Sequence, residues 1–507
     1  MAAYFKRCII DRSKLYCSVL LLVYPFWWSC SNRHVQTINK FQNELNIISD
    51  SLQAWTDSHS PVGVEVLILK DQKELLHKAY GWKDFENKVP LQTNSVFRVA
   101  SMTKPLTATG ILILKQRGQL KIDDKISKYL PNFMSISGDS LSIEHLLRHS
   151  SGYGELQVWK DYGEELRLFN GLESVVNVLS QYEPAMPVGT EEYSSLNTIL
   201  LSAILEKVSG MPAERFIKEN ILSPLKMTNT YLLEEPGTDW FNKIPRTYGV
   251  HDGEPEVYWI PGQHPSMYPF FRGATGAATT VTDYARFLQM WLNKGKLDGK
   301  RVLEESTVEE ALNNNGKSIG LHWFVPVSPD ESDVFGHAGW YGTCGAAYQK
   351  DNAIALYFTQ TYNNPKISEF YELLSYSGIL EHKGPYDIQK ELPNLPEQPN
   401  SEFLEAYEGT YRAVTSDGLE WVADIVMTEG HLEANIRSEV DSWIDKLVFV
   451  KPDTFAPGFI KGSTALAVAP KVFYQFKGVG SFEVTVLGNP EFSFKTINSS
   501  PAAHSED

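Results

Sequence analysis

"RVASMTKPLTATGILIL", residues 98–114, places a serine three positions before a lysine at the start of a long apolar run. Ser101 and Lys104 are one helical turn apart, so they share a face if the run is a helix. Pro105 falls in the first turn of that helix, where its missing N–H is tolerated. The residues that follow are apolar on all sides, which is typical of a buried helix rather than a surface one. The stretch therefore predicts a polar pair at the mouth of a buried helix.

This pair has the residue types of a nucleophile and its base. A serine hydroxyl becomes a good nucleophile only when a nearby group takes its proton. A lysine does this where its surroundings favour the neutral amine, and the free N–H groups of a helix start favour the resulting negative charge. The Ser-x-x-Lys spacing is common by chance, however, and a serine that begins a helix is more often a cap. Ser101 and Lys104 are thus a hypothesis that needs support from the rest of the chain.

The composition is that of a soluble globular protein with more than one domain. The chain has 507 residues, of which 42% are hydrophobic and 21% charged, and that length exceeds what one hydrophobic core usually serves. The formal net charge of −16 repels phosphate backbones, so nucleic acid is not an expected partner.

Residues 1–30 have the pattern of an export signal: a basic region precedes the apolar stretch "LYCSVLLLVYPFWWSC". Cys30 ends this stretch and is followed by polar residues, which resembles a bacterial lipoprotein signal with a lipidated cysteine. A plain secretory signal and an uncleaved anchor are the alternatives. All three predict a protein exported to the periplasm or outer envelope, with Cys30 as the candidate site of membrane attachment. Cys344 is the only cysteine after the leader, so no disulfide is expected there.

Apolar patterning divides the rest of the chain into strands at both ends and helices between them. Strands are predicted in 62–81, 320–327, 345–350 and 352–360, and helices in 142–154, 197–210 and 281–295. Strands from both ends can pair in one antiparallel sheet. The prediction for residues 31–383 is an α/β (α+β) domain, an antiparallel sheet flanked by helices with a mostly helical insertion.

The C-terminal quarter has a different pattern. Residues 384–400 are polar, rich in proline and without periodicity, which indicates a linker. Short strands separated by turns follow, so residues 401–500 are predicted to form a small all-β barrel or sandwich. Residues 501–507 are expected to be a frayed tail.

Six blocks in order resemble the class C β-lactamase and D,D-peptidase superfamily of serine hydrolases, which includes penicillin-binding-protein-like members and family VIII-type esterases. They run from about residue 45 to 375. The blocks are "FRVASMTKPLTATGILILKQRGQLKIDDKI", "SIEHLLRHSSG", "GTEEYSSLNTILLSAILEKVSG", "PLKMTNTY", "GATGAATTVTDYARFLQMWLNKGKLDGKRVL" and "GHAGWYGTCGAAYQKDNAIALYFTQ". The resemblance implies the β-lactamase/transpeptidase-like fold.

The resemblance also implies catalytic roles at matching positions. Ser101 is then the acylated nucleophile, Lys104 assists its deprotonation, and Tyr193 of "YSS" shares the acid/base work. His337 opens "HAG", which matches the third catalytic element of esterase-like relatives. The backbone N–H groups of Ser101 and Trp340 would form the oxyanion hole. No cofactor is implied.

Two departures from the family pattern bear on the substrate. Ser195, a candidate substrate-binding residue with Gly339, stands where the family often has asparagine, and His337 offers no permanent cation for a β-lactam carboxylate. The sequence therefore favours an exported, esterase-like serine hydrolase that cleaves an ester or amide. The alternatives are a penicillin-binding-like or peptidoglycan-binding protein with little turnover, and a D-amino-acid peptidase or β-lactamase.

Two rival sites are weaker. "GKSIG" at 316–320 fits a nucleophile elbow around Ser318, but that elbow needs a strand before the serine and a helix after it, and the flanking residues predict neither. His145 and His149 stand four apart, as zinc ligands on a helix can, yet Leu146 replaces the glutamate base and no third ligand is evident. We expect a surface loop at Ser318 and hydrogen-bonding histidines at a helix end, with no metal.

Overall fold

The computed structural model describes residues 40–496 with several gaps. The gaps are 134–139, 155–168, 170, 252, 264–269, 317, 326–332, 364–365, 381–403, 415–419, 429–430, 439–441, 452–453, 462–463, 468–471, 477–480 and 487–488. The predicted leader (1–30), linker (384–400) and tail (501–507) lie outside the described residues.

A six-stranded antiparallel sheet joins the two ends of the first domain. In spatial order its strands are β10 (Val334–Gly339), β11 (Thr343–Tyr348), β12 (Ala353–Thr359), β1 (Gly63–Lys70), β2 (Lys73–Asp84) and β3 (Val89–Pro90). β1 pairs with β12, so Val64 lies opposite Thr359 across almost 300 positions of sequence. The prediction that strands from both ends share one sheet is confirmed.

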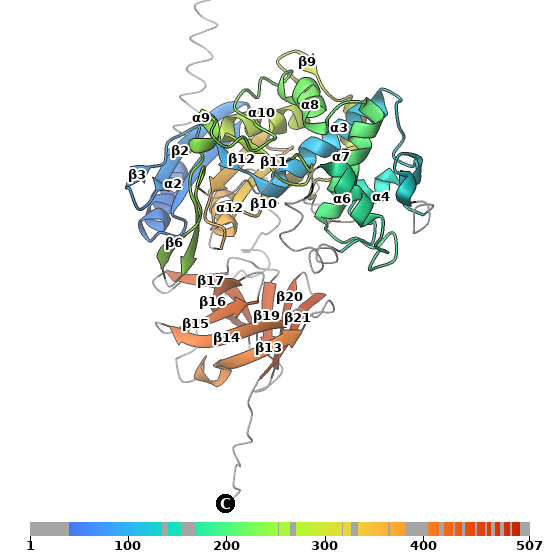
Figure 1. Ribbon diagram of the computed structural model, residues 1–507. Helices are drawn as coiled ribbons and strands as arrows, with labels where there is room; N and C mark the ends of the chain where they lie inside the picture. The colour runs from blue at the N-terminus through green and yellow to red at the C-terminus, as the bar shows by residue number, and fades with distance from the viewer. Residues whose placement is uncertain are drawn as a thin grey trace, which may run out of the picture.

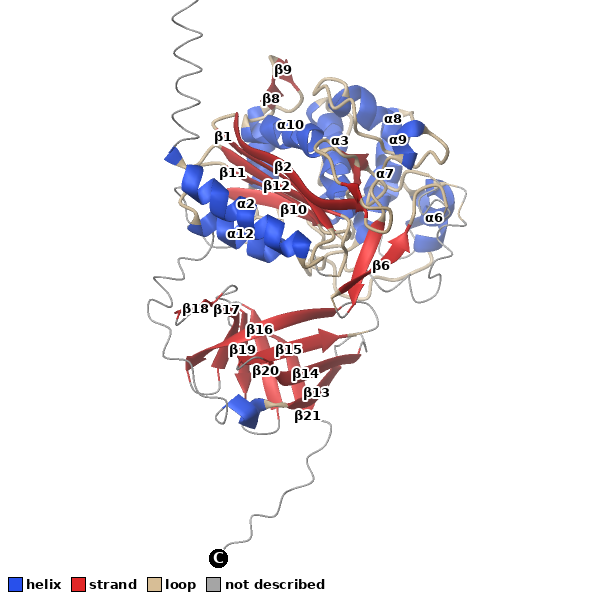
Figure 2. Ribbon diagram, turned by 90° about the vertical axis from the view of Figure 1, so that its left-hand side faces the viewer, coloured by secondary structure: helices blue, strands red, loops and turns tan. Residues whose placement is uncertain are grey.

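Helices cover both faces of this sheet. α2 (Gln42–Asp57) and α12 (Ile367–Tyr376) lie together on one face, whereas α10 (Val281–Leu292) packs on the other, as Figure 2 shows. Every residue of β1 is buried as a result. This explains why β1 lacks the apolar–polar alternation of a strand with one wet face.

The apolar run that follows Ser101 is the buried helix that the sequence predicts. η1 (Ala100–Thr103) leads into α3 (Lys104–Gln116), in which every residue from 104 to 114 is buried. α3 packs against α7 (Ser195–Ser209). Gly110 allows this close approach, because a Cβ there would lie 3.1 Å from a methyl group of Leu205.

Smaller elements complete the domain. The helices are α4 (Ile143–Leu147), α6 (Leu172–Leu179), α8 (Ala213–Ile217), α9 (Asp239–Asn242) and α11 (Glu305–Leu312), with η2 (Ile126–Lys128), η3 (Pro131–Phe133) and the π-helical η5 (Lys218–Leu222). Two-stranded pairs are β4 (Phe97–Arg98) with β7 (Ala278–Thr279), β5 (Thr247–His251) with β6 (Glu254–Trp259), and β8 (Lys296–Leu297) with β9 (Lys300–Arg301). In the part of the chain that the structure describes, none of the helices has the length and apolar character needed to cross a membrane.

The C-terminal strands form a separate antiparallel sheet (Figure 1). In spatial order they are β16 (Ser442–Lys451), β15 (His431–Arg437), β14 (Glu420–Thr428), β13 (Gly409–Val414), β21 (Asn489–Thr496), β20 (Ser481–Val486), β19 (Val472–Phe476), β17 (Thr454–Lys461) and β18 (Thr464–Ala467), preceded by η6 (Glu405–Tyr407). β16 also pairs with β17, which closes the sheet into a barrel. The predicted β-rich C-terminal architecture is confirmed. Of the two predicted forms, barrel and sandwich, the barrel is present.

One predicted strand is wrong. Residues 320–325 form bends, with isolated bridges from Phe324 to Ile319 and Gly336 in place of a ladder, and 326–327 lie outside the described residues. The physical reason is His322, whose φ of 72° lies in the left-handed region. An extended strand requires negative φ, so the chain turns at this residue.

Candidate active site

Lys104 lies within hydrogen-bonding distance of the candidate nucleophile. Its Nζ donates to Ser101 Oγ at 2.9 Å, to Ser195 Oγ at 3.1 Å and to the carbonyl oxygen of Ala274 at 3.2 Å. The Lys104 side chain is fully buried, whereas Ser101 is half-buried. The three oxygens match the three N–H bonds of an ammonium group. The pair that the sequence singles out is thus assembled, with the hydroxyl on the accessible side.

Ser101 sits on a tight, strained turn between β4 and α3. Ala100, the residue before it, has a φ of 41°, a region that non-glycine residues rarely adopt. The turn is held by Met102, whose N–H donates to the Val99 carbonyl at 3.0 Å, and by Thr103 Oγ1, which donates to the Ala100 carbonyl at 2.6 Å. Backbone strain of this kind gathers at functional sites. The sequence carries no signal for it.

Tyr193 reaches the same point from the start of α7. Lys104 Nζ lies 4.9 Å from the centroid of the Tyr193 ring. Ser194, the next residue, caps α7, because its Oγ accepts the N–H of Leu196 at 3.2 Å. The cap fixes the backbone beside Tyr193, so the phenol ring is positioned by the same turn that begins the helix.

Behind Tyr193 lies a stack of two buried imidazoles that the sequence does not predict. The His149 ring stacks on Tyr193, with centroids 4.7 Å apart, and on His322 at 4.4 Å. His149 Nδ1 accepts the N–H of Ser194 at 3.1 Å. His322 Nδ1 donates to the Leu147 carbonyl at 2.7 Å, which leaves Nε2 to accept from Thr198 Oγ1 at 2.8 Å. Both rings are therefore bonded as neutral tautomers.

The acid–base properties of the stack agree with this bonding. Burial lowers the pKa of His149 well below its usual value, and the charges of His322 and Lys104 lower it further. Burial is also the main cause that lowers the pKa of His322 to about 3. The sequence predicts a hydrogen-bonding histidine at position 149, and the structure has such a bond from Ser194, but the packing of this ring on Tyr193 has no signal in the motif "HLLRH".

His337 lies on β10 and is the third histidine near Tyr193. Its ring centroid is 6.1 Å from that of Tyr193 and 4.9 Å from that of Phe324. His337 Nδ1 donates to the carbonyl of Ala338 at 2.7 Å, which leaves Nε2 as an acceptor. Burial, followed by the charge of Lys104, lowers the pKa of His337 to about 3. His337 is therefore neutral at pH 7.

The turn after His337 brings backbone close to Ser101. A Cβ on Gly339 would lie 2.3 Å from the Val99 carbonyl oxygen, so only glycine fits this approach. Gly342 N–H donates to the Gly339 carbonyl at 3.0 Å and closes the turn. Trp340 stands at its tip with 50% of its surface exposed.

Ser195 has a more specific place than the sequence suggests. It begins α7, is buried, and its Oγ accepts from Lys104 Nζ. Its hydroxyl therefore contacts Lys104, the candidate base. This contact follows from the packing of α3 on α7, which local sequence patterns do not show.

The rival sites lack their required context. Ser318 is exposed in a loop, where its hydroxyl hydrogen-bonds the Glu191 carboxylate, and bends rather than a helix follow it.

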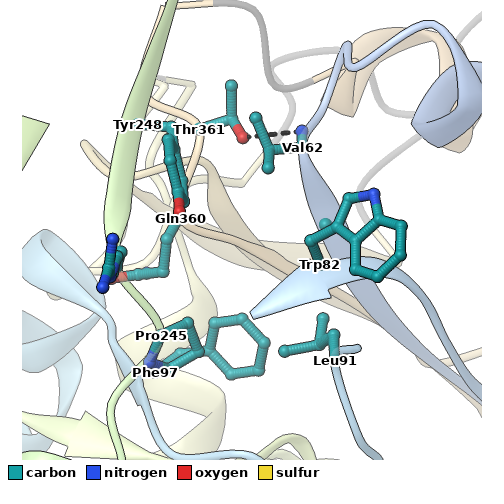
Figure 3. Close-up of a pocket in the computed structure, with 10 residues that line it drawn as sticks. Val62, Trp82, Leu91, Phe97, Pro245, Tyr248, Gln360 and Thr361 are labelled. Carbon is teal, nitrogen blue, oxygen red and sulfur yellow. Dashed lines mark hydrogen bonds between the residues drawn. The ribbon is translucent and has the colours of Figure 1, made fainter. Parts of the chain in front are cut away.

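His145 caps its own short helix, because its Nδ1 accepts the N–H of Ser142 at 3.2 Å. Within the described ranges, no group of His, Cys, Asp or Glu residues could hold a metal ion. A pocket near β5 does not have Ser101 in its lining, which includes Trp82, Leu91, Phe97, Tyr248 and Gln360 (Figure 3).

Comparison with known proteins identifies the family. Residues 46–374 match the family model described as Beta-lactamase, so the chain belongs to the Beta-lactamase family. The resemblance inferred from the six sequence blocks is confirmed. The similar proteins include one named as a penicillin-binding protein and one described as a hydrolase.

Particular relatives share different parts of the chain. The chain is 27% identical over 377 residues to "Penicillin-binding protein 4*" of Bacillus subtilis (strain 168), which covers 71% of this chain and 79% of that protein. It is 33% identical over 197 residues to "Protein flp" of Staphylococcus aureus (strain NCTC 8325 / PS 47), which covers 38% of each chain.

Two solved structures share the fold. EstCE1, described as a hydrolase with promiscuous acyltransferase activity, has a TM-score of 0.58 at 20% identity and covers 67% of this chain and 100% of its own. The octameric penicillin-binding protein homologue from Pyrococcus abyssi has a TM-score of 0.59 at 18% identity and covers 89% and 99%. The second match extends beyond the β-lactamase-like part of this chain. At these identities the structures support the fold alone.

Proposed function

We propose that this protein is an exported serine hydrolase that cleaves carboxylic esters through an acyl-enzyme on Ser101. The observation that carries the proposal is the 2.9 Å contact between Lys104 Nζ and Ser101 Oγ at the start of a buried helix. Family membership supports the same chemistry, because a hydrolase is among the relatives that share the fold.

Acylation begins with a proton transfer from serine to lysine. When Lys104 is a neutral amine, it donates its two protons to Ser195 Oγ and the Ala274 carbonyl and keeps its lone pair for the Ser101 hydroxyl proton. Ser101 Oγ then attacks the ester carbonyl carbon. The backbone N–H groups of Ser101 and Trp340 stabilise the oxyanion of the tetrahedral intermediate. The C–O bond to the leaving group breaks, and the alkoxide takes a proton from Lys104, directly or through the Tyr193 phenol.

Deacylation repeats these steps with water as the nucleophile. Water attacks the acyl carbonyl while the Lys104–Tyr193 pair accepts one of its protons. The bond to Ser101 Oγ then breaks, and the serine regains that proton as the carboxylic acid leaves. No cofactor enters this scheme.

The charge at the site favours esters over β-lactams. A β-lactam carries a carboxylate that needs a cation or several hydroxyls near the third catalytic element. Here the pKa of His337 is lowered to about 3, so the ring is uncharged at pH 7, and Ala338 has no hydroxyl. An ester places fewer demands on these groups, because it has no carboxylate that must be bound and its alkoxide leaving group requires weaker protonation than an amine.

The test compares p-nitrophenyl acetate and butyrate with a chromogenic cephalosporin. We expect kcat/KM for the esters to exceed that for the cephalosporin by about tenfold or more, a difference of about 1.4 kcal/mol in transition-state stabilisation. The Ser101→Ala variant removes the Ser101-dependent part of each rate. Cephalosporin hydrolysis that depends on Ser101 and equals the ester rate would contradict the ester preference.

A second candidate is a penicillin-binding-like protein with little turnover, favoured by the similarity to "Penicillin-binding protein 4*" over 71% of the chain. Intact mass spectrometry separates the two functions. A stable β-lactam adduct on Ser101, with no release over hours and no ester turnover, would favour this candidate.

Export rests on residues 1–30 alone. The proposed lipid anchor predicts a mature N-terminus at Cys30 that carries acyl chains. Mass analysis of the membrane fraction of cells that express wild type or the Cys30→Ala variant tests it, and an unmodified Met1 in both would contradict cleavage and lipidation at Cys30. Recovery of the wild-type chain from the cytoplasmic fraction alone would contradict export.

A further inference from the structure

Three aromatic side chains lie together beside the turn that carries Trp340. The rings of Trp340 and Tyr362 are nearly parallel, with centroids 4.9 Å apart and 8° between their planes. The Tyr258 ring lies 5.8 Å from Trp340 and 5.1 Å from Tyr362. Trp340 is 50% and Tyr258 45% exposed. We call Tyr258, Trp340 and Tyr362 the aromatic surface.

The aromatic surface rests on a buried ion pair next to the nucleophile turn. Tyr341, which follows Trp340, packs against the Arg98 guanidinium at 4.4 Å from its ring centroid. The same guanidinium lies 4.3 Å from the ring centroid of Trp259, the neighbour of Tyr258. Arg98 pairs with Glu234 at 3.1 Å, and both side chains are 3% exposed. The surface and the segment that leads to Ser101 therefore share one rigid support.

Tyr362 is held by its backbone as well. Its N–H donates to the carbonyl of Tyr248 at 3.1 Å, and Tyr248 N–H donates to the Gln360 carbonyl at 2.8 Å. Tyr248 is 1% exposed. Side chains that are already fixed lose little conformational entropy when a ligand binds, so the aromatic surface is preformed.

The position of Trp340 relates this surface to one part of the substrate. An ester carbonyl carbon carries three groups: the carbonyl oxygen, the leaving group and the acyl substituent. In the mechanism proposed above, the oxygen lies at the backbone N–H of Trp340, and the leaving group lies toward the Lys104–Tyr193 pair, which returns its proton. The ring contacts of Tyr193 are with His149, Phe324 and His337, whereas those of Trp340 are with the aromatic surface and Tyr341. The aromatic surface is thus on the acyl side.

The charge around the surface limits what it binds. Glu256 lies on β6 two residues before Tyr258 and is exposed. Burial raises the pKa of Tyr362, and Tyr258 and Glu256 raise it further, so the Tyr362 phenol is neutral. The net charge of the chain is also negative. An anionic acyl substituent would be repelled here.

We propose that the aromatic surface binds the acyl group of the substrate and that this group carries an uncharged aromatic ring. Flat rings offset-stack or meet edge-to-face at centroid distances of about 4.5–7 Å, and exposed indole and phenol faces supply both arrangements. Small-molecule sites are typically lined by aromatic side chains of this kind. The inference rests on the ester-cleaving function proposed above and names the substrate class for it.

The experiment compares two esters that share a leaving group, p-nitrophenyl phenylacetate and p-nitrophenyl acetate. We expect wild type to prefer the phenylacetate in kcat/KM by about tenfold, the size of one good aromatic contact. Trp340→Ala is expected to remove this preference, whereas Trp340→Phe retains most of it. The ratio of the two rates within one variant cancels differences in folded fraction, so a purely structural role for Trp340 would leave the ratio unchanged.

Controls separate this inference from the proposed function. Ile47→Ala, which removes an exposed apolar side chain on α2, should leave both rates unchanged. If wild type acylates Ser101 with both esters at equal rates, or if Trp340→Ala lowers both rates alike, the aromatic surface is not the acyl site although the hydrolase stands. If neither ester acylates Ser101 by intact mass, the proposed function has failed, and with it this inference.

Discussion

The two sides of the site differ in how their buried nitrogen atoms are hydrogen-bonded. On one side Lys104 Nζ is surrounded by three oxygen acceptors. On the other side His149, His322 and His337 are each bonded as neutral rings, although the buried Nε2 of His149 finds no hydrogen-bond partner among the described residues. Lys104 Nζ is thus hydrogen-bonded to oxygens only, whereas each imidazole is bonded as a neutral ring.

This difference means that the imidazoles do not compete with Lys104 as bases. The charge of Lys104 contributes to the lowered pKa of each of the three histidines. Dry, neutral rings hold Tyr193 in place without competing for the serine proton.

Replacing Lys104 is expected to reduce activity more than any other change discussed below. Lys104→Met keeps a long apolar side chain in the buried position but deletes the base, so we expect kcat for ester hydrolysis to fall by about 10³-fold, within the range for general-base removal. Lys115→Met on the same helix, where the lysine pairs with Glu310, is the matched control and should retain activity. Activity of the Lys104 variant within tenfold of wild type would assign the base elsewhere.

A second prediction concerns His322 and the pH dependence of the free energy of unfolding. The pKa of His322 is about 3 in the folded protein, below an unfolded value near 6.5. Between these values the unfolded chain binds a proton that the folded chain does not, so stability falls as pH falls. From pH 7 to pH 5 this group alone lowers the free energy of unfolding by about 2 kcal/mol.

The variant that isolates this effect is His322→Gly, because glycine adopts the φ of 72° without strain. Its loss of stability between pH 7 and pH 5 should be smaller than that of wild type by the same amount, measured by denaturant unfolding at each pH. His251→Asn, at an exposed histidine on β5, is the control. Equal pH slopes for wild type and His322→Gly would show that His322 is not held neutral.

A smaller effect on catalysis is expected from removing one of the three hydrogen-bond acceptors of Lys104. Ser195→Ala removes one oxygen acceptor from Lys104, and the loss of one hydrogen bond, about 1 kcal/mol, predicts a fall in kcat/KM of about fivefold. Ser195→Asn supplies an amide oxygen and should recover part of the loss. If alanine and asparagine at this position behave alike, the contact with Lys104 has no role in catalysis.

The sequence predicts the parts of the site that lie close together in the chain or in ordered family blocks. The spacing of Ser101 and Lys104 and the apolar run after them predict the pair and its buried helix, and both are present. The sheet joined from β1 and β12 follows from strand patterns at both ends. These features depend on local periodicity, which a single sequence shows directly.

The parts that were missed depend on packing between distant segments. His149 and His322 are 173 positions apart, their rings stack, and both residues lie in left-handed backbone conformations. The same conformation at His322 explains why the strand expected at 320–327 is absent from the described residues there. The strain at Ala100 and the grouping of Tyr258 with Trp340 likewise arise from tertiary contacts that no local pattern encodes.

The most direct test of the central claim is to locate the covalent bond that an activated-serine probe forms. The protein is treated with a fluorophosphonate, and the modified residue is identified by intact mass and peptide mapping in wild type, Ser101→Ala and Ser318→Ala. If Ser101 is the nucleophile, we expect one adduct on Ser101 in wild type and Ser318→Ala, and none in a folded Ser101→Ala variant. An adduct that persists in Ser101→Ala and disappears in Ser318→Ala would contradict it.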